Sequence, residues 1–149
     1  MITIRRLSKH KYNARKIEVD GIRFDSKAEA DYYLYLKYLQ SINEVRSFYL
    51  QPVIKLLPSF KYNGKTIRKM DYRLDFKVEY MDGKVEYIDV KGMATTDAKM
   101  KLKIARYLNQ DKTIKWISRS YKHGDDFGWV EYDELQRKRR LEKRKQRVD

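Results

Sequence analysis

The clearest hydrophobic pattern in the chain is an alternation of apolar and polar side chains over residues 67–80, which is unbroken from Met70 onward. The apolar positions of this segment are Met70, Tyr72, Leu74, Phe76, Val78 and Tyr80, and the polar ones are Asp71, Arg73, Asp75, Lys77 and Glu79. A period of two is typical of a β-strand that buries one face. Met81-Asp82-Gly83 has the composition of a tight turn, so we expect residues 84–91 to return as the hairpin partner of this strand.

Other segments have helical spacing or turn signals. Ser26-Lys27-Ala28-Glu29 is a capping box, which predicts a helix from there to about Ser41. Amphipathic spacing predicts further helices at 96–110 and 131–147. Shorter strands are expected on both sides of Asp20-Gly21, at 48–57 around Pro52, and at 114–118. The order of elements predicts an α/β (α+β) fold, with a central mixed, mainly antiparallel sheet flanked by helices and a basic C-terminal helix.

The length of 149 residues favours one domain, 1–149, with a basic N-terminal arm at 1–16 and a basic C-terminal helix and tail at 131–149. The chain has no cysteine, which excludes disulfides and makes a structural zinc site a poor interpretation. It has no apolar run of membrane-spanning length and no signal-peptide core, so we expect a cytoplasmic protein and no membrane partner.

Charge points to a polyanionic partner. The chain has 35 Lys and Arg against 21 Asp and Glu, a formal net charge of +14. Such an imbalance opposes compaction unless an anion neutralises it, and nucleic acid is the first candidate, ahead of an anionic membrane surface. The expected DNA-binding residues lie on the two later helices: Lys99, Lys101, Lys103, Arg137, Lys138, Arg139 and Arg140. The alternative for the C-terminal run is a solvated tail.

Asp89 and Lys91 are the strongest candidates for chemistry. An acid two residues before Lys or Arg occurs at eight places in the chain, so this spacing alone is not specific. Asp89 differs from the others because it lies in an apolar strand that Gly92 ends, where an acid without a partner is rare. Together with Asp75, it could hold a hard divalent cation and position a water against a phosphate.

The register of the predicted hairpin decides whether Asp75 and Asp89 meet. A two-residue turn pairs residues whose numbers sum to 165, which places Asp75 opposite Val90. A three-residue loop with Gly83 in the left-handed conformation pairs residues that sum to 164, which places Asp75 beside Asp89 and Arg73 beside Lys91. A metal site requires the second register or an equivalent bulge, and Met81-Asp82-Gly83 is compatible with both.

With these residues the chain resembles the PD-(D/E)XK nuclease superfamily. Within it, the chain is similar to phage and prophage endonuclease I-like proteins, a group that includes Holliday junction resolvases. The resemblance covers roughly residues 12–118 and rests on Lys11 to Ala14, Asp20 to Ala30, Tyr72 to Phe76 and Asp89 to Gly92. It implies a restriction-endonuclease-like core. One departure is Asp89, where many relatives carry the longer Glu.

The resemblance also implies roles. Glu29, Asp75, Asp89 and Lys91 would be catalytic, and Lys101 would be a further basic residue. Asp75, Asp89, Glu29 and the Val90 carbonyl would be ligands of Mg²⁺ or Mn²⁺. The implied function is a metal-dependent DNA endonuclease that cuts branched DNA as a homodimer in the bacterial host cytoplasm, and leaves 5′-phosphate and 3′-hydroxyl ends.

Several alternatives remain open from the sequence. Asp75 and Asp89 could form structural ion pairs with Arg73 and Lys91, and Glu29 could only cap its helix. His123 with Asp125 and Asp126 could bind a metal by chance. The protein could also be a nuclease of the same chemistry for nicked, flapped or linear duplex DNA, or a non-catalytic basic DNA-binding module.

Overall fold

A computed structural model describes the backbone of residues 4–6 and all of residues 16–148. Most of the predicted N-terminal basic arm at 1–16 lies outside these residues. Ile4–Arg6 forms strand β1, which pairs with β2 (Ile17–Val19), and β2 pairs with β3 (Ile22–Phe24) through the expected Asp20-Gly21 turn.

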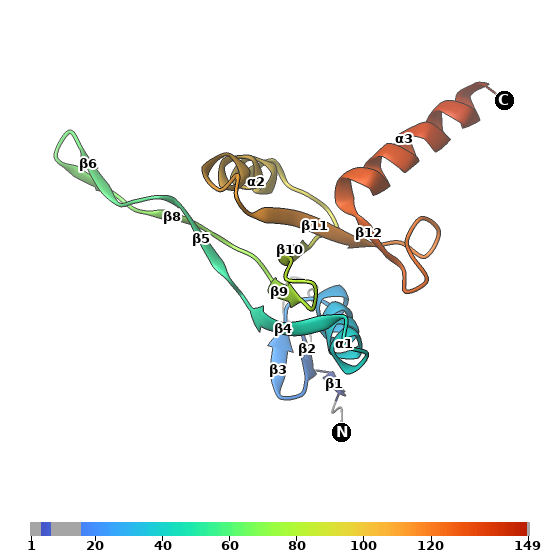
Figure 1. Ribbon diagram of the computed structural model, residues 1–149. Helices are drawn as coiled ribbons and strands as arrows, with labels where there is room; N and C mark the ends of the chain where they lie inside the picture. Colours follow the sequence, from blue (N-terminus) through green and yellow to red (C-terminus); the bar gives the residue numbers. More distant parts are fainter. Residues whose placement is uncertain (1–3, 7–15, 149) are drawn as a thin grey trace.

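The centre of the molecule is a five-stranded sheet with the strand order β12-β11-β10-β9-β4 (Figure 1). Its strands are β4 (Val45–Leu50), β9 (Phe76–Tyr80), β10 (Val85–Val90), β11 (Thr113–Arg119) and β12 (Trp129–Glu131). Only β10 and β11 run parallel, and helix α2 (Thr96–Leu108) connects them. The predicted class, a mixed and mainly antiparallel sheet flanked by helices, is therefore confirmed.

Two hydrophobic clusters hold the helices to the sheet. Helix α1 (Lys27–Ser41) packs against a cluster that includes Phe76, Ile88 and Val90, and α2 packs against a second one that includes Tyr72 and Trp116. Successive residues of a strand point to opposite faces, so Ile88 and Val90 lie in one cluster while Asp89 faces the other side. The predicted cap of α1 is present, with Ser26 Oγ accepting the amide hydrogen of Glu29 over 3.1 Å.

The alternating segment 67–80 is not one strand, as predicted, but three: β7 (Lys65–Ile67), β8 (Met70–Arg73) and β9. The chain changes partner between β8 and β9. The Leu74 amide donates to the Pro52 carbonyl, whereas the Asp75 amide donates to the Ile88 carbonyl. Every second residue stays buried through this change, but Tyr72 and Leu74 are buried in the cluster of α2, whereas Phe76 and Val78 are buried in the cluster of α1.

Before this change of partner, the chain forms a long two-stranded projection, residues 53–73, which we call the ribbon. Strand β5 (Val53–Leu57) pairs with β8, and β6 (Phe60–Tyr62) pairs with β7 around an Asn63-Gly64 turn. Figure 1 shows the ribbon leaving the body on one side and the C-terminal helix α3 (Tyr132–Val148) leaving it on the other. Within the described part of the chain, no helix has the length and apolar character needed to cross a membrane.

Candidate functional site

The observed hairpin register is the one that a metal site requires. The pairs Val85–Glu79, Glu86–Val78, Tyr87–Lys77 and Ile88–Phe76 all sum to 164. The loop is Met81-Asp82-Gly83, closed by a hydrogen bond from the Tyr80 amide to the Lys84 carbonyl, and Gly83 has a φ of +91°. A side chain at this backbone conformation would be strained, so glycine fixes the odd-length loop and, with it, the register.

This register brings Asp75 and Asp89 together at the end of the β9–β10 pair. Asp75 directly precedes Phe76, and Asp89 directly follows Ile88, the strand partner of Phe76. The two side chains therefore project from the same side of the sheet, where Asp89 acts on Asp75 at close range. Asp75 Oδ2 also accepts the Val90 amide hydrogen over 2.8 Å. The N–H and C=O of one strand residue point toward the same neighbouring strand, so the Val90 carbonyl lies on the Asp75 side of β10.

Asp89 is almost fully buried, with a relative exposure of 6%, and three side chains surround it. Lys91 Nζ lies 2.8 Å from Asp89 Oδ2, and the Tyr72 hydroxyl donates to the same oxygen over 3.0 Å. Trp116 Nε1 in turn donates to the Tyr72 hydroxyl over 2.7 Å. Burial raises the pKa of Tyr72, so this phenol stays protonated and remains a donor to the carboxylate.

The prediction that Arg73 lies beside Lys91 was wrong. Arg73 does not lie beside Lys91, because it ends β8 and pairs with Val53 of the ribbon. The ion pair of Lys91 is instead with Asp89 along its own strand, and its ammonium also lies 5.3 Å from the centre of the Trp116 ring. Lys91 is thus held on the Asp89 side of the sheet by one carboxylate and one aromatic face.

The crowding of carboxyl groups has an electrostatic consequence. Burial, the hydrogen bond and charge of Asp89, and the charge of Glu29 together raise the pKa of Asp75 to about 9. This shift favours the protonated form of Asp75 in the metal-free protein. Acids crowded in this way mark a position where added positive charge is favourable.

Glu29, on helix α1, lies near Asp75. It lines an open cavity of about 290 Å³ together with Arg23, Asp25, Gln51 and Asp75. Burial and the nearby Asp25 and Asp89 raise the pKa of Glu29, while its hydrogen bond with Ser26 opposes the shift. The residue therefore both belongs to the helix cap and contributes its carboxyl group to the cavity wall.

The oxygen donors gathered here are of the kind that Mg²⁺ and Mn²⁺ take. Two carboxyl groups side by side offer a place where a divalent cation would relieve the repulsion that helps to raise the pKa of Asp75. Within residues 4–6 and 16–148, no three His, Cys, Asp or Glu side chains form a complete metal-binding group on their own. Mg²⁺ commonly keeps several waters and binds through one or two carboxylates plus substrate phosphates, so two aspartates can be sufficient.

Sequence comparison adds the family. The model of a family described as "Protein of unknown function (DUF1064)" matches residues 9–125, which is more than half of the chain. The chain belongs to the DUF1064 family. No curated protein and no solved structure matches it.

The DUF1064 match contains all four predicted catalytic residues and ends before α3. Of the predicted DNA-binding residues inside the match, Lys99 and Lys103 are exposed on one side of α2, while Lys101 is half-buried on another. The basic residues of α3 lie outside it. Arg139 and Arg140 are exposed, but Arg137 pairs with Glu134, and Lys138 donates to the His123 carbonyl.

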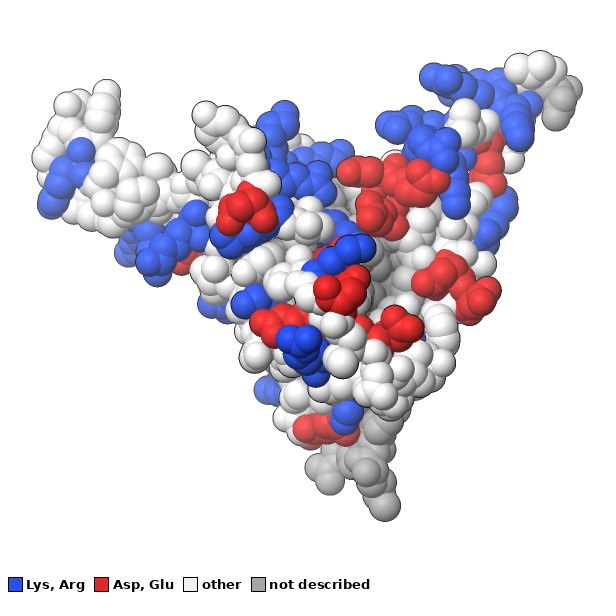
Figure 2. All heavy atoms as spheres, viewed as in Figure 1, with Lys and Arg blue, Asp and Glu red and all other residues white. Residues whose placement is uncertain are grey.

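Basic side chains gather along α3 and on the ribbon, the two projections of the molecule (Figure 2).

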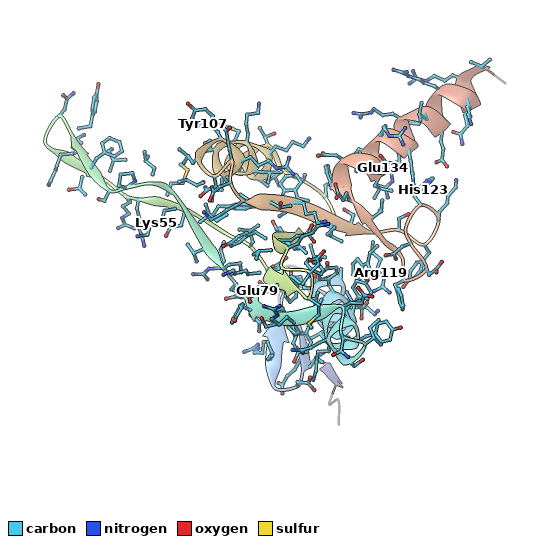
Figure 3. The ribbon with its side chains drawn as sticks, in the orientation of Figure 1. Lys55, Glu79, Tyr107, Arg119, His123 and Glu134 are labelled. Atoms are coloured by element: carbon cyan, nitrogen blue, oxygen red, sulfur yellow. The ribbon has the colours of Figure 1, made fainter. Side chains whose placement is uncertain are left out.

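The alternative metal site at His123 is not supported by the contacts of its residues. His123 Nε2 lies 3.2 Å from Glu142 of α3, and Asp125 Oδ1 accepts the amide hydrogens of Phe127 and Trp129. Figure 3 shows His123 in the loop beside α3.

Tyr72 and Trp116 are the site residues that sequence reasoning missed. Tyr72 lies in the quoted segment Tyr72 to Phe76, where alternation assigned it only to the core. Trp116 stands directly opposite Asp89 in the parallel β10–β11 pair. The register of this strand pair depends on how α2 crosses the sheet. The sequence predicted the helix and the two strands, but it could not predict which residues of the two strands stand opposite each other.

Proposed function

We propose that this protein is a metal-dependent endonuclease that hydrolyses phosphodiester bonds in DNA. One observation carries the proposal: the Asp75 carboxyl group, which accepts the Val90 amide hydrogen over 2.8 Å, lies beside the buried Asp89, and Lys91 Nζ lies 2.8 Å from Asp89 Oδ2. Paired carboxylates and an amine at the end of a β-hairpin supply both the cation ligands and the charge that phosphoryl chemistry needs.

In this proposal Asp75, Asp89, the Val90 carbonyl and Glu29 hold Mg²⁺ or Mn²⁺. When bound, the cation supplies positive charge that polarises the scissile phosphate and makes a water easier to deprotonate. Glu29 also faces the cavity that Asp75 lines, where it can accept a hydrogen bond from the attacking water.

Lys91 acts on the phosphate itself. During hydrolysis the bond from the water oxygen to phosphorus forms while the bond from phosphorus to the 3′ oxygen breaks, and negative charge accumulates on the phosphate oxygens. The Lys91 ammonium stabilises that charge, and Asp89, Tyr72 and Trp116 keep the ammonium in place. The products are a 5′-phosphate and a 3′-hydroxyl, a polarity that follows from the resemblance to PD-(D/E)XK nucleases.

The preferred substrate in this proposal is branched DNA, and above all the Holliday junction, as the resemblance to phage and prophage resolvases implies. Symmetric cleavage of two strands requires two active sites. The chain offers one aspartate pair of this kind among its described residues, so the working form would be a homodimer in the bacterial host cytoplasm.

A cleavage and binding experiment tests the proposal. Wild-type protein with Mg²⁺ should cut a four-way junction in preference to a linear duplex of the same sequence, and Asp75→Ala should lose cleavage by at least about 1,000-fold. Asp75→Ala should still bind the junction in EDTA. Asp111→Ala is the matched control, because Asp111 is an exposed aspartate in the turn between α2 and β11, at the opposite end of the sheet.

Each outcome assigns a function. Equal cutting of junction and linear duplex would favour a nuclease for nicked, flapped or linear DNA. Junction binding without any cleavage by the wild type would mean that the protein is a non-catalytic DNA-binding module.

A further inference from the structure

The ribbon is a structural feature that the aspartate site does not explain. All residues from Leu57 to Met70 are exposed, and Tyr62 near the tip keeps 65% of its surface accessible. An isolated two-stranded ribbon is only marginally stable in water. Several large apolar side chains are exposed on it: Val53, Leu57, Phe60, Tyr62, Ile67 and Met70. Exposed apolar groups on a projection are typical of a surface that a partner covers.

The charge of the ribbon indicates a polyanion as that partner. The ribbon has six basic residues, all exposed: Lys55, Lys61, Lys65, Arg68, Lys69 and Arg73. Its only acid is Asp71, and this carboxylate is already paired with Lys69 over 3.2 Å. A surface with this balance attracts phosphates. The like charge of two ribbons also opposes the packing of one ribbon against another.

The strand pairing distributes the side chains over both faces of the tip. Phe60 stands opposite Ile67 and Tyr62 opposite Lys65, so these four share one face, while Lys61 and Thr66 share the other. A lysine is therefore present on each face, and Tyr62 stands opposite Lys65 on one of them. A two-stranded ribbon of this kind fits the major groove of B-DNA, where it can reach base edges and both phosphate backbones.

The base of the ribbon is fixed to the aspartate site. Ile54, Leu56 and Tyr72 are buried in the cluster that packs on α2, and the Tyr72 hydroxyl donates directly to Asp89. Just beyond Arg73, the Gln51 amide donates to the Asp75 carbonyl over 2.9 Å. DNA held by the ribbon would thus be held at a fixed distance from Asp75.

The reach of the ribbon matches a DNA dimension. Asp75 and the Gly64 turn are eleven residues apart, which at about 3.3 Å per residue is at most about 36 Å. One turn of B-DNA is about 34 Å long. The tip can therefore contact the duplex about one helical turn from the phosphate at the site.

We propose that the ribbon enters the major groove of a duplex arm of the DNA substrate, with its lysines and arginines against the phosphates and Tyr62 at the groove floor. The ribbon then holds the duplex about one turn from the bond that the aspartate site cuts. This inference rests on the proposed function for the identity of the partner, but it concerns binding and not catalysis. Figure 3 shows the path of the ribbon away from the body, with Lys55 near its base.

Charge removal at the tip tests the proposal. The variant Lys61→Gln/Lys65→Gln is compared with Lys84→Gln/Lys112→Gln, which removes the same charge from exposed lysines at the opposite end of the sheet. Binding of a fluorescein-labelled duplex is measured by anisotropy in EDTA over a series of salt concentrations. The tip variant should bind about tenfold more weakly, and its salt slope should fall by about 2, whereas the control pair should bind within about twofold of the wild type.

A labelling experiment identifies what the tip touches. The chain has no cysteine, so Thr66→Cys gives a single site for a benzophenone maleimide on the exposed strand β7. Irradiation with DNA in EDTA should crosslink the label to a DNA strand. Crosslinking to a second protein chain, together with dimer loss by Lys61→Gln/Lys65→Gln in sedimentation, would overturn the proposal in favour of a dimerisation ribbon. Equal binding by the tip and control variants would also overturn it.

The two proposals fail separately. If the wild type cuts no DNA but tip-dependent binding holds, the nuclease is wrong and the ribbon inference stands. If the wild type cuts DNA and the tip variant binds as the control pair does, the ribbon inference is wrong and the nuclease stands.

Discussion

Tyr72 donates its hydroxyl hydrogen to Asp89 over 3.0 Å while it accepts the indole hydrogen of Trp116 over 2.7 Å. The phenol is therefore the link between a core tryptophan and the buried carboxylate of the proposed metal site. Groups that orient a metal-binding carboxylate usually matter nearly as much as the ligand itself.

Tyr72→Phe removes this link with little change in volume. We expect cleavage to fall about 10- to 100-fold and the Mg²⁺ concentration for half-maximal cleavage to rise, because Asp89 loses a fixed donor. The free energy of unfolding should fall by about 1–2 kcal/mol, because the Trp116 N–H loses its buried acceptor. Tyr132→Phe is the control, since its ring also contacts Trp116 but lies outside the chain of hydrogen bonds to Asp89. An unchanged Mg²⁺ requirement in Tyr72→Phe would mean that the tyrosine is only structural.

Variants of Ser26 and Glu29 distinguish a role of Glu29 in capping its helix from a role in catalysis. Ser26→Ala removes the side chain that accepts the Glu29 amide, so we expect a loss of about 1 kcal/mol in stability and cleavage within a few-fold of the wild type. Glu29→Gln keeps that backbone hydrogen bond but removes the carboxylate from the cavity, so cleavage should fall at least about tenfold with no loss of stability. Chemical unfolding and junction cleavage of both variants give the comparison. If Glu29→Gln cleaves as well as the wild type, Glu29 serves only its helix.

Lys91→Ala should lose cleavage by about 100- to 1,000-fold, because the developing charge on the phosphate loses its ammonium. Binding in EDTA should persist. Lys115→Ala is a close control, since Lys115 is a lysine of similar exposure on the neighbouring strand and is also ion-paired, with Glu86. Lys91→Ala removes the ion pair of Asp89, and Lys115→Ala removes the ion pairs of Glu86 and Glu131, so some loss of stability is expected in both. Only the Lys91 variant should lose cleavage, and equal activities would contradict the assigned role.

The stability of the metal-free protein should depend on pH through Asp75. Its pKa is raised in the folded state, so the unfolded chain ionises first as pH increases. In EDTA the free energy of unfolding should therefore fall as pH rises from about 4 toward about 9. Asp75→Asn should remove most of this dependence and be more stable than the wild type near pH 8, on the order of 2 kcal/mol. Unfolding in urea at several pH values gives the answer, and parallel profiles for the two proteins would refute the raised pKa.

The sequence predicted the elements of the fold better than their partners. Alternation over 67–80 identified extended chain, but it carried no sign of the break at Leu74, because the backbone changes partner from Pro52 to Ile88 while the side chains keep alternating. The ribbon was missed for the same reason. Strands were expected at 53–57 and within 67–80, but β6 (Phe60–Tyr62) was not. Which strands pair with each other depends on contacts beyond the local pattern.

The sequence predicted the pairing of Asp75 with Asp89 except for the choice between two hairpin registers. The sequence left two hairpin registers open, and the structure has the one in which Gly83 adopts a positive φ and Asp75 lies beside Asp89. Trp116 was beyond sequence reasoning, because its position opposite Asp89 depends on the register of a parallel pair connected by a helix. Catalysis, metal binding and DNA preference remain predictions.

A calorimetric titration of the protein with Mn²⁺ near neutral pH, repeated in buffers of different ionisation enthalpy, tests the central claim most directly. If a cation takes the place of the proton on Asp75, binding should release about one proton per site, and Asp75→Asn should abolish both the binding and the release. Identical isotherms for the wild type and Asp75→Asn, or the absence of Mn²⁺ binding to the wild type, would contradict the account.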